Sequence, residues 1–325
     1  MEFLSLAFLV VFVFLVSIWL LDKIKINING RYVLITGCDT GFGNLIAKQL
    51  DKKGCYVFAA CFTEKGASDL RAASSNRLKT VQMDVTKSES IKAAYDIVKA
   101  DIPANKGLWG VINNAGVTGH PGQYNWWTRE EIRSIIEVNL LGVVEVTNVF
   151  LPLIKKAKGR IVNISSAHGI YSMPIGGYEM AKYGIEAFSD GLRILMKPYG
   201  VTVHILEPGY FRTEVTNKDG NIFPRMDRAW NRLTPEEREE YGEEYYQDLK
   251  NVMSERFLDN ASDKLYLVTD AMEHALTAWW PWRRYLPGWD AKLLYKPLSM
   301  LPAFLTDNLD LIFRIKTPIP KVCKK

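Results

Sequence analysis

Short apolar runs alternate with amphipathic stretches from residue 31 onward. Six runs rich in branched and aromatic residues are predicted strands: Tyr32–Ile35, Cys55–Cys61, Leu78–Met83, Leu108–Ile112, Arg160–Ile164 and Val201–Leu206. Four stretches between them have helical periodicity: Asn44–Lys53, Glu89–Ala100, Glu130–Lys155 and Gly177–Lys197. Strands that alternate with helices predict an α/β domain, in which helices cover both faces of a doubly wound parallel sheet.

The first part of the chain differs from the rest. Residues 3–21 form an apolar run interrupted only by two serines, and about 20 such residues suffice to span a bilayer. Glu2 precedes the run and no small-residue cleavage site ends it, so a retained anchor is favoured over a cleaved signal. We assign residues 1–22 to a transmembrane or signal anchor and 23–29 to a linker. Lys23 and Lys25 favour a cytosolic position for the body of the protein.

The chain changes character twice more. We assign residues 30–278 to one catalytic domain, within which the polar segment 210–260 is interpreted either as a lid over a substrate or as a solvated helical face. Residues 279–325 form an apolar C-terminal extension that contains four tryptophans and repeated prolines. Because prolines interrupt helices, a spanning helix is not expected there. The extension can pack on the core or lie at a membrane surface, and we favour packing.

Composition excludes some classes of function. The 325 residues include 41 basic and 36 acidic side chains, and a net charge of +5 with no basic motif argues against nucleic acid as a partner. The four cysteines form no C-x-x-C pair, and the four histidines form no H-E-x-x-H motif. A metal site is therefore not expected, and reduced thiols are the simplest interpretation.

A glycine-rich turn follows the first predicted strand of the body. Gly37, Gly41 and Gly43 come directly after that strand and open a helix. Glycine allows a phosphate to approach the backbone closely, and the free N–H groups of a helix N-terminus favour an anion. This arrangement predicts a site for the pyrophosphate of a dinucleotide.

Polar residues follow the ends of later predicted strands, where ligands bind in open α/β sheets. Asp84 ends the third strand, and its carboxylate is interpreted either as an acceptor for an adenine amine or as a turn aspartate. Asn113 and Ala115 belong to the Asn-Asn-Ala-Gly stretch after the fourth strand. Asn139 lies inside an apolar helical pattern, where a buried amide needs partners. It is interpreted as a core asparagine or as a residue that kinks the helix and relays a proton through water.

Tyr178 and Lys182 carry the candidate chemistry. They lie four positions apart, which places them on one face of a helix. An ammonium beside a phenol favours the phenolate, so we predict that Lys182 lowers the pKa of Tyr178 from about 10. Ser166 lies twelve residues before Tyr178, and its hydroxyl is suited to hold a substrate oxygen against the phenol. These groups predict transfer of a proton and a hydride between an alcohol and a nicotinamide cofactor.

These motifs together resemble those of the short-chain dehydrogenase/reductase family, from about Gly30 to Thr213. The turn 36–43, the stretch 59–65 and Trp289–Lys292 are similar to the branch of microsomal retinol dehydrogenases and 3α/17β-hydroxysteroid dehydrogenases. The resemblance implies a single-domain Rossmann-type fold. It also implies that Tyr178 is the general base, that Lys182 holds the nicotinamide ribose, that Ser166 positions the substrate and that Asn139 completes the set. Ser166 is preferred over Ser165 because the catalytic serine of the family is usually the second of the pair. The cofactor residues that we assign are Gly37, Asp39, Thr40, Gly41, Phe42, Gly43, Asp84, Asn113, Ala115, Tyr178, Lys182, Pro208, Gly209 and Thr213.

The resemblance favours NAD over NADP, although neither an acidic residue nor an arginine follows the second predicted strand, and Lys65 leaves NADP open. The expected enzyme oxidises or reduces a lipophilic alcohol or carbonyl, either a retinoid or a hydroxysteroid. It is expected in the endoplasmic reticulum membrane, held there by residues 3–21, and in a homo-oligomer as many relatives are. The alternative is a non-catalytic nucleotide sensor or scaffold on the same fold.

Overall fold

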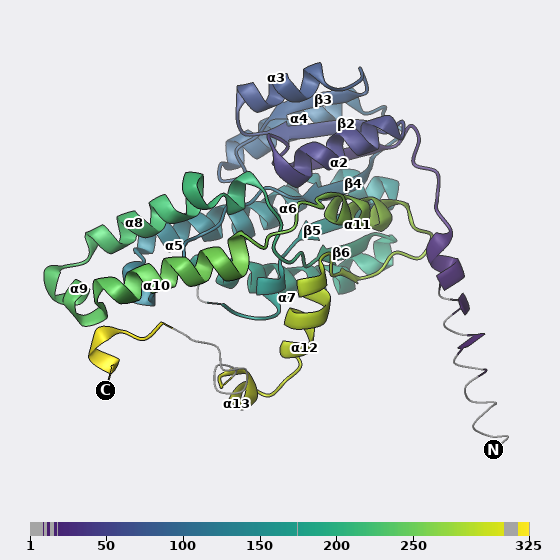
Figure 1. Cartoon of the computed structure of the whole chain (residues 1–325). Coiled ribbons are helices and arrows are strands. Elements are labelled where there is room, and N and C mark those ends of the chain that lie inside the picture. Colours follow the sequence, from purple (N-terminus) through teal and green to yellow (C-terminus); the bar gives the residue numbers. More distant parts are fainter. Residues whose placement is uncertain are drawn as a thin grey trace.

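The computed structural model describes residues 9, 12, 13, 16, 17, 19–173, 175–308 and 318–324. The predicted anchor at residues 3–21 therefore lies mostly outside the described residues. Residues 309–317 and 325 of the predicted C-terminal extension also lie outside them. Within the described part the chain forms one α/β body, from which the helical residues 19–23 and the last short helices project (Figure 1).

One parallel sheet forms the centre of the body. Its strand order is β3-β2-β1-β4-β5-β6-β7, and every neighbouring pair runs parallel. The order reverses between β1 and β4, so the carboxyl ends of these two strands flank the crevice of a doubly wound sheet. The strands are β1 (Tyr32–Thr36), β2 (Tyr56–Cys61), β3 (Leu78–Gln82), β4 (Leu108–Asn113), β5 (Arg160–Ile164), β6 (Thr202–Leu206) and β7 (Arg284–Tyr285). Six of them were predicted, and the two-residue β7 was not.

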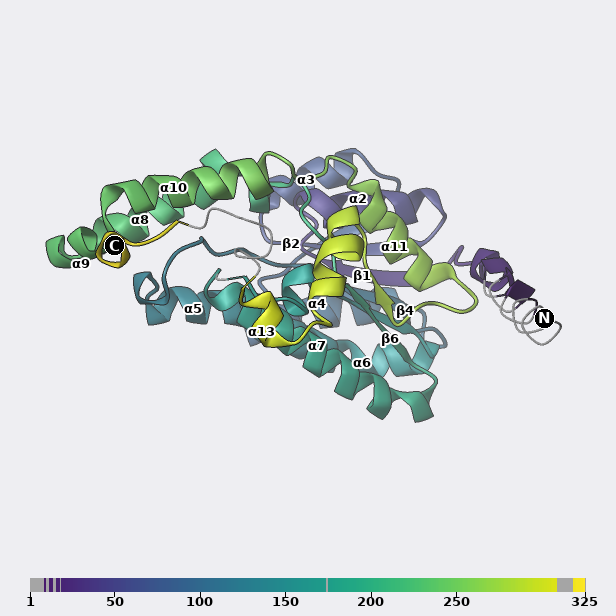
Figure 2. The ribbon, with the colours of Figure 1, turned by 60° about the horizontal axis from the view of Figure 1, so that its bottom comes forward.

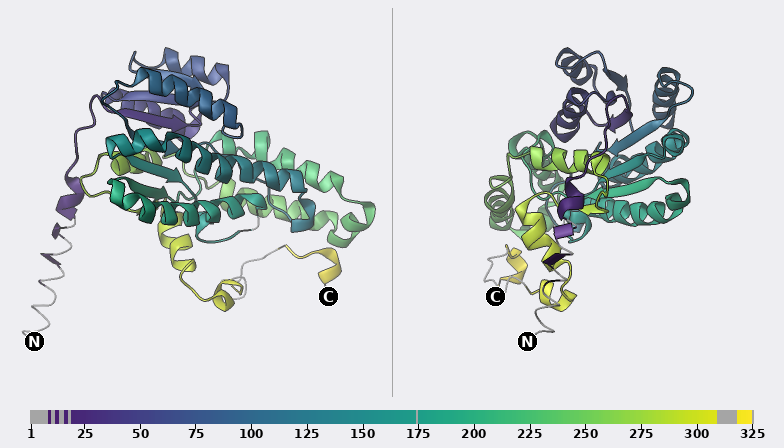
Figure 3. Two further views of the ribbon diagram at one scale, coloured as in Figure 1. Left: turned by 180° about the vertical axis from the view of Figure 1, so that it is seen from behind. Right: turned by 90° about the vertical axis from the view of Figure 1, so that its right-hand side faces the viewer.

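Helices cover both faces of this sheet, as the alternating pattern predicted (Figure 2, Figure 3). Successive residues of β1 point to opposite faces, so Val33 and Ile35 enter one buried core while Tyr32 and Leu34 enter the other. The first core is closed by α2 (Gly41–Lys52), α3 (Glu64–Ala72) and α11 (Tyr266–Thr277). The second is closed by α4 (Ser88–Asp101), α6 (Gly142–Ala157) and α7 (Gly177–Met196). The fold class is confirmed.

The predicted 130–155 helix is interrupted. It consists of α5 (Arg129–Ile136), a π-helical stretch η2 (Glu137–Leu141) and then α6. A capping box of Thr128 and Glu131 begins α5. Among the described residues, this stretch from Arg129 to Ala157 is the one helix long and apolar enough to cross a membrane. It packs on the sheet through buried residues such as Phe150, as core helices do.

The segment 210–260 forms a helical arm that extends from the body (Figure 1). The arm consists of α8 (Phe223–Arg232), α9 (Pro235–Tyr241) and α10 (Glu243–Met253). It has an aromatic core of its own, in which Trp126 from the body meets Trp230 and Tyr246. Arg225 donates a hydrogen bond to the carbonyl of Thr118 at 2.6 Å. The arm is therefore anchored to the loop after β4 rather than loosely attached.

The C-terminal extension packs on the core only in part. Its described residues include the short helices α12 (Lys296–Leu298) and α13 (Ala303–Thr306), which lie below the body in Figure 1. Ala291 and Tyr295 are buried, but all four predicted tryptophans of the extension are exposed: Trp279, Trp280, Trp282 and Trp289. The expectation that the extension packs internally is therefore wrong for its tryptophans.

Candidate active site

The turn between β1 and α2 is tightly packed. Gly37 has φ +69°, and a Cβ on it would lie 2.7 Å from the Cα of Ala115. A Cβ on Gly43 would lie 2.2 Å from the carbonyl oxygen of Gly37. Asn114 supports the turn from β4 by donating to the carbonyls of Thr36 and Gly37 at 2.9 and 3.0 Å. Glycine is required at both positions because any side chain would push the turn away from the sheet or from α2.

Beyond this turn the N-terminus of α2 is open. Thr40 is the N-cap residue, and its side chain caps no backbone N–H group. A Cβ on Gly41 would meet nothing closer than Thr213, at 3.8 Å, so free space lies beside the first turn of the helix. Uncapped N–H groups and the positive end of the helix dipole suit an anion such as a pyrophosphate. The chain's own geometry therefore fits the dinucleotide that the glycine pattern predicts.

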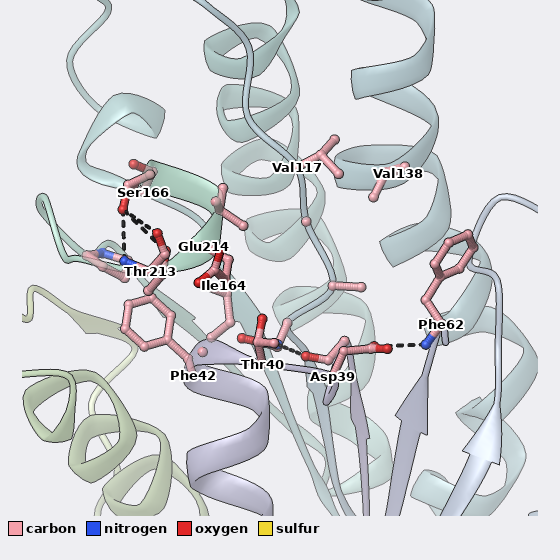
Figure 4. Close-up of a pocket in the computed structure, with 18 of the residues that line it drawn as sticks. Asp39, Thr40, Phe42, Phe62, Val117, Val138, Ile164, Ser166, Thr213 and Glu214 are labelled. Carbon is pink, nitrogen blue, oxygen red and sulfur yellow. Dashed lines mark hydrogen bonds between the residues drawn. The ribbon is translucent and has the colours of Figure 1, made fainter. Parts of the chain in front are cut away.

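A cavity of about 480 Å³ continues from this turn along the carboxyl ends of the strands. Ser166 lies at one end of it in Figure 4, while Asp39 and Phe62 lie at the other. The cavity brings together thirteen of the sixteen predicted site residues, namely Gly37, Asp39, Thr40, Gly41, Phe42, Asp84, Ala115, Ser166, Tyr178, Lys182, Pro208, Gly209 and Thr213. Segments more than 170 residues apart in the chain thus meet in one crevice.

The proposed catalytic groups meet at the Ser166 end. The Ser166 hydroxyl lies beside the Tyr178 phenol, and both side chains line the cavity. The Lys182 ammonium lies 5.4 Å from the centre of the Tyr178 ring and donates a hydrogen bond to the carbonyl of Ile164 at 2.8 Å. Ser165 instead faces the backbone of Lys182, to whose carbonyl its hydroxyl donates at 3.4 Å. The geometry thus supports the choice of Ser166 over Ser165.

The pKa of Tyr178 differs from the expectation. Burial raises the pKa of this phenol above its ordinary value, and the hydrogen bond from Ser166 opposes the rise only in part. Burial also lowers the pKa of Lys182 to about 8. The predicted net lowering of the tyrosine pKa is therefore wrong for the chain alone. In this structure desolvation outweighs the opposing effect of Ser166.

Asn139 lies in the π-helical stretch and is completely buried. Its side-chain oxygen accepts from the N–H of Val117 at 2.8 Å, and its side-chain nitrogen donates to the carbonyl of Val117 at 2.7 Å. The helix deviates from α geometry at the predicted place. Asn139 therefore holds the loop after β4 beside Lys182, and its part in a proton relay stays a prediction.

Two other predicted cofactor residues do not line the cavity. Asn113 is buried within the sheet, where its side-chain nitrogen donates to Thr147 and Asn163 at 2.9 and 2.8 Å. Gly43 serves the close packing of α2 on the turn. Asp84 lines the cavity and also accepts hydrogen bonds from the N–H and hydroxyl of Thr86. The interpretation of Asp84 as a turn residue is confirmed, and its part as an acceptor for an adenine amine stays a prediction.

Sequence reasoning missed how Asp39 is placed. Its carboxylate accepts hydrogen bonds from the backbone N–H groups of Phe62 at 2.9 Å and of Thr63 at 2.8 Å (Figure 4). The hydroxyl of Thr63 donates to it as well, at 2.6 Å. An acidic group therefore does lie at the carboxyl end of β2, but it comes from the turn after β1. No sequence motif links Asp39 to Phe62 and Thr63, so the sequence alone did not predict this contact.

Comparison with known proteins agrees with the site. A family model described as short chain dehydrogenase matches residues 31–221, which is more than half of the chain. The chain therefore belongs to the short-chain dehydrogenase family and is an oxidoreductase of that type. The assembled serine, tyrosine and lysine give no support to a non-catalytic sensor.

Two curated relatives are similar over most of their length. Retinol dehydrogenase 16 of Rattus norvegicus is 50% identical over 288 residues, which cover 88% of this chain and 90% of the relative. The 17-beta-hydroxysteroid dehydrogenase type 6 of Homo sapiens is 49% identical over 283 residues, which cover 87% and 88%. Among solved structures, a short-chain dehydrogenase from Streptomyces avermitilis matches with a TM-score of 0.69 and 26% identity, covering 89% of this chain and 99% of that one.

Proposed function

We propose that this oxidoreductase acts on a lipophilic alcohol or the matching carbonyl compound, with NAD as its cofactor. The observation that carries the proposal is that Ser166, Tyr178 and Lys182 meet at one end of a cavity that reaches the glycine-rich turn. A bound nicotinamide would supply the hydride acceptor for oxidation of the alcohol and the hydride donor for reduction of the carbonyl.

The residues of the chain supply the rest of the chemistry. Tyr178 takes the proton of the substrate hydroxyl during oxidation and returns it during reduction. Ser166 donates a hydrogen bond to the substrate oxygen, which holds that oxygen against the phenol. Lys182 places a positive charge 5.4 Å from the ring centre, and this charge favours the phenolate during the proton transfer. General base catalysis by such a group typically contributes about 10²- to 10⁴-fold to the rate.

The choice of NAD over NADP is supported by Asp39. Its carboxylate is fixed at the end of β2, the position at which an acidic residue meets the adenosine ribose in doubly wound folds. A phosphate on that ribose would be repelled by this charge. Lys65, the residue that left NADP open, forms an exposed ion pair with Asp69 at 2.6 Å and does not line the cavity.

The lipophilic nature of the substrate is supported by the surroundings of Ser166. The next residue, Ala167, packs in a buried apolar cluster with Ala291 and Tyr295, and Tyr171, Met173 and Tyr210 border this cluster. The names of the relatives describe dehydrogenases for retinol and for a hydroxysteroid, both large apolar alcohols. Retinoids and hydroxysteroids are accordingly the two substrate classes that we propose.

We further propose an anchor at residues 3–21 in the endoplasmic reticulum membrane, with the catalytic body on the cytosolic side. The sequon Asn260-Ala-Ser262 tests the orientation, because Asn260 is exposed and is glycosylated only in a lumen. A protein that shows no mobility shift after glycosidase treatment is expected. A shift abolished by Asn260→Gln would place the body in the lumen.

The decisive experiment compares all-trans-retinol with 3α- and 17β-hydroxysteroids as substrates of the full chain, each with NAD and with NADP. We expect turnover of at least one of these alcohols, with the higher kcat/KM for NAD. Absence of turnover in every combination, from a protein that binds NAD, would contradict the proposed substrate class. Turnover retained in Tyr178→Phe would contradict the proposed base.

A further inference from the structure

The end of the N-terminal helix is fixed to the start of the C-terminal extension. Lys25 and Ala278 form an antiparallel bridge, and the N–H of Trp279 donates to the carbonyl of Ile24 at 2.7 Å. Asp22 adds a contact to His274 at 3.1 Å. The point at which the predicted anchor enters the body is therefore held beside Trp279.

From that point the chain exposes large apolar side chains for some 25 residues. We call residues 279–304 the docking segment. Trp280 is 70% exposed, Trp289 is 74% exposed and Phe304 is 67% exposed. The other exposed apolar residues of the docking segment are Trp279, Trp282, Leu293, Leu294, Met300 and Leu301. An apolar surface of this extent is unusual on a soluble face and marks a site of interaction.

Exposed basic residues accompany this surface. Lys23 and Lys25 follow the N-terminal helix, and Arg283 and Lys292 lie within the docking segment. Trp19 is exposed as well, with the Lys23 ammonium 5.5 Å from its ring centre. Tryptophan with lysine or arginine is the combination that membrane interfaces favour, because the rings lie at the headgroup level and the cations meet anionic lipids.

The docking segment and the described end of the N-terminal helix, residues 19–23, both lie at the lower part of the body. Figure 1 shows α12 and α13 below the sheet and residues 19–23 beside its lower edge, and the view from behind in Figure 3 shows the same arrangement. The helical arm and α4 project elsewhere. A bilayer that holds the anchor would consequently contact the docking segment. The same bilayer would block a second copy of the chain from this surface.

We propose that the docking segment lies in the surface of the same bilayer as the anchor and that substrate enters the active site through this contact. The proposal rests on the membrane location proposed above. Its occupant is a lipid bilayer with anionic headgroups, into which the exposed rings insert to interfacial depth, about 5–10 Å.

The docking segment also packs against the residues that follow Ser166, so a lipid contact there would lie next to the active site. Tyr295 and Ala291 pack against Ala167, the residue after Ser166. The His168 ring lies 5.8 Å from the Tyr295 ring and 6.2 Å from the Tyr178 ring, centre to centre. Leu293 and Leu294, between the two buried residues, are exposed. One short helical stretch thus has its buried side on Ala167, next to Ser166, and an exposed side that is open to a bilayer.

Site-specific labels test the contact without any need for turnover. The described part of the chain has one exposed cysteine, Cys323, and Cys323→Ser leaves the buried Cys38, Cys55 and Cys61. In that background, Leu293→Cys and Phe304→Cys are labelled with an environment-sensitive fluorophore, and the full chain is placed in vesicles of phosphatidylcholine and phosphatidylserine. Ile97→Cys, on exposed α4, is the matched control.

We expect a blue shift and strong quenching by brominated lipid for the labels at 293 and 304, and neither effect for the label at 97. Equal responses at all three positions would overturn the proposal. If the labels at 293 and 304 showed the blue shift in detergent, and the shift grew with protein concentration, a second copy of the chain would cover this surface. That result would also overturn the proposal.

A kinetic arm tests substrate entry. In Leu293→Asp/Phe304→Asp we expect a several-fold higher KM for an alcohol presented in vesicles, with unchanged kcat/KM for a short water-soluble secondary alcohol. An unchanged KM in vesicles would overturn the entry route. Loss of activity toward both alcohols in the wild type would contradict the proposed function instead, while the fluorescence result would still stand.

Discussion

The carboxylate of Asp290 accepts a hydrogen bond from the backbone N–H of Tyr210 at 2.7 Å. Tyr210 follows Pro208 and Gly209, which line the cavity. Asp290 approaches so closely that a Cβ on Gly209 would lie 2.0 Å from its side-chain oxygen. This contact joins the cofactor loop after β6 to the docking segment, as does the hydrogen bond from the N–H of Gly209 to the carbonyl of Pro287 at 3.1 Å.

Asp290→Ala should loosen the cofactor loop. A hydrogen bond to a charged group contributes about 1.5–3 kcal/mol, so we expect a loss of this size in the free energy of unfolding and a higher KM for NAD. Chemical denaturation and initial rates measure the two effects. Asp263→Ala is the control, because Asp263 forms an exposed ion pair with Arg212 and should change stability by less than about 1 kcal/mol. Equal losses in both variants would argue against a specific role for Asp290.

Tyr178→Phe should abolish most turnover without unfolding the protein. The phenol hydroxyl is the proposed base, and its removal should lower kcat by about 10²- to 10⁴-fold. Binding of NADH, followed by its fluorescence, should persist. Tyr183→Phe on the same helix is the control, because Tyr183 is exposed and does not line the cavity. If kcat in Tyr178→Phe stayed near the wild-type value, another residue would be the base.

Asp39→Ser should shift cofactor preference toward NADP. Two like charges about 4 Å apart near a protein surface repel by up to about 4 kcal/mol, so removal of the carboxylate should raise the NADP/NAD ratio of kcat/KM by roughly tenfold or more. Asp96→Ser, which removes an exposed acidic group of α4, should leave the ratio unchanged. No change in the ratio for Asp39→Ser would remove this residue from cofactor selection.

Asn139→Leu should destabilise the fold. It leaves the N–H and carbonyl of Val117 buried without the partners they have now, and each orphaned group costs about 1–3 kcal/mol. Thermal and denaturant unfolding measure the loss. Asn148→Ala changes an exposed amide of α6 and should alter stability by no more than about 0.5 kcal/mol. A variant as stable as the wild type would mean that water or another residue satisfies Val117.

Lys182 should make stability depend on pH in the alkaline range. Burial lowers the pKa of this lysine from 10.5 to about 8 in the folded chain. Between these values the unfolded chain binds more protons than the folded one, so the contribution of Lys182 to the free energy of unfolding rises with pH, by up to about 1.4 kcal/mol per unit. The difference in slope between the wild type and Lys182→Met measures it. Lys197→Met, an exposed lysine just after α7, should keep the wild-type slope.

Much of the site was predictable because it depends on local chain geometry. Tyr178 and Lys182 are four apart on one helix, and the glycines of the turn follow a strand, so spacing alone places them. Asn113 shows the limit of such reasoning. Its side chain faces the sheet interior, whereas that of its neighbour Asn114 supports the turn. Which of two adjacent residues faces a cavity depends on the register of the strand, and a short sequence motif does not specify that register.

The remaining differences arise from contacts between distant segments. Asp39 is 23 residues from Phe62, and the bond between them depends on how two parallel strands end side by side. The net pKa of Tyr178 depends on burial by the whole fold. Trp289 is a residue type that is often buried, and only the position of the extension in the structure shows that its side chain is exposed.

The π-helical stretch at residues 137–141 has a consequence for the rotational phase of the long helix. Each residue of an α-helix turns the chain by about 100°. The extra residue of the π-helical turn therefore rotates α5, which faces the helical arm, relative to α6, which packs on the sheet. Deletion of a single residue there would restore regular α geometry and rotate Asn139 away from Val117. The number of residues in this helix is thus fixed by the packing of α5 at one end and of α6 at the other. An insertion or deletion of one residue would disturb the loop beside Lys182 without removing any side chain that lines the cavity.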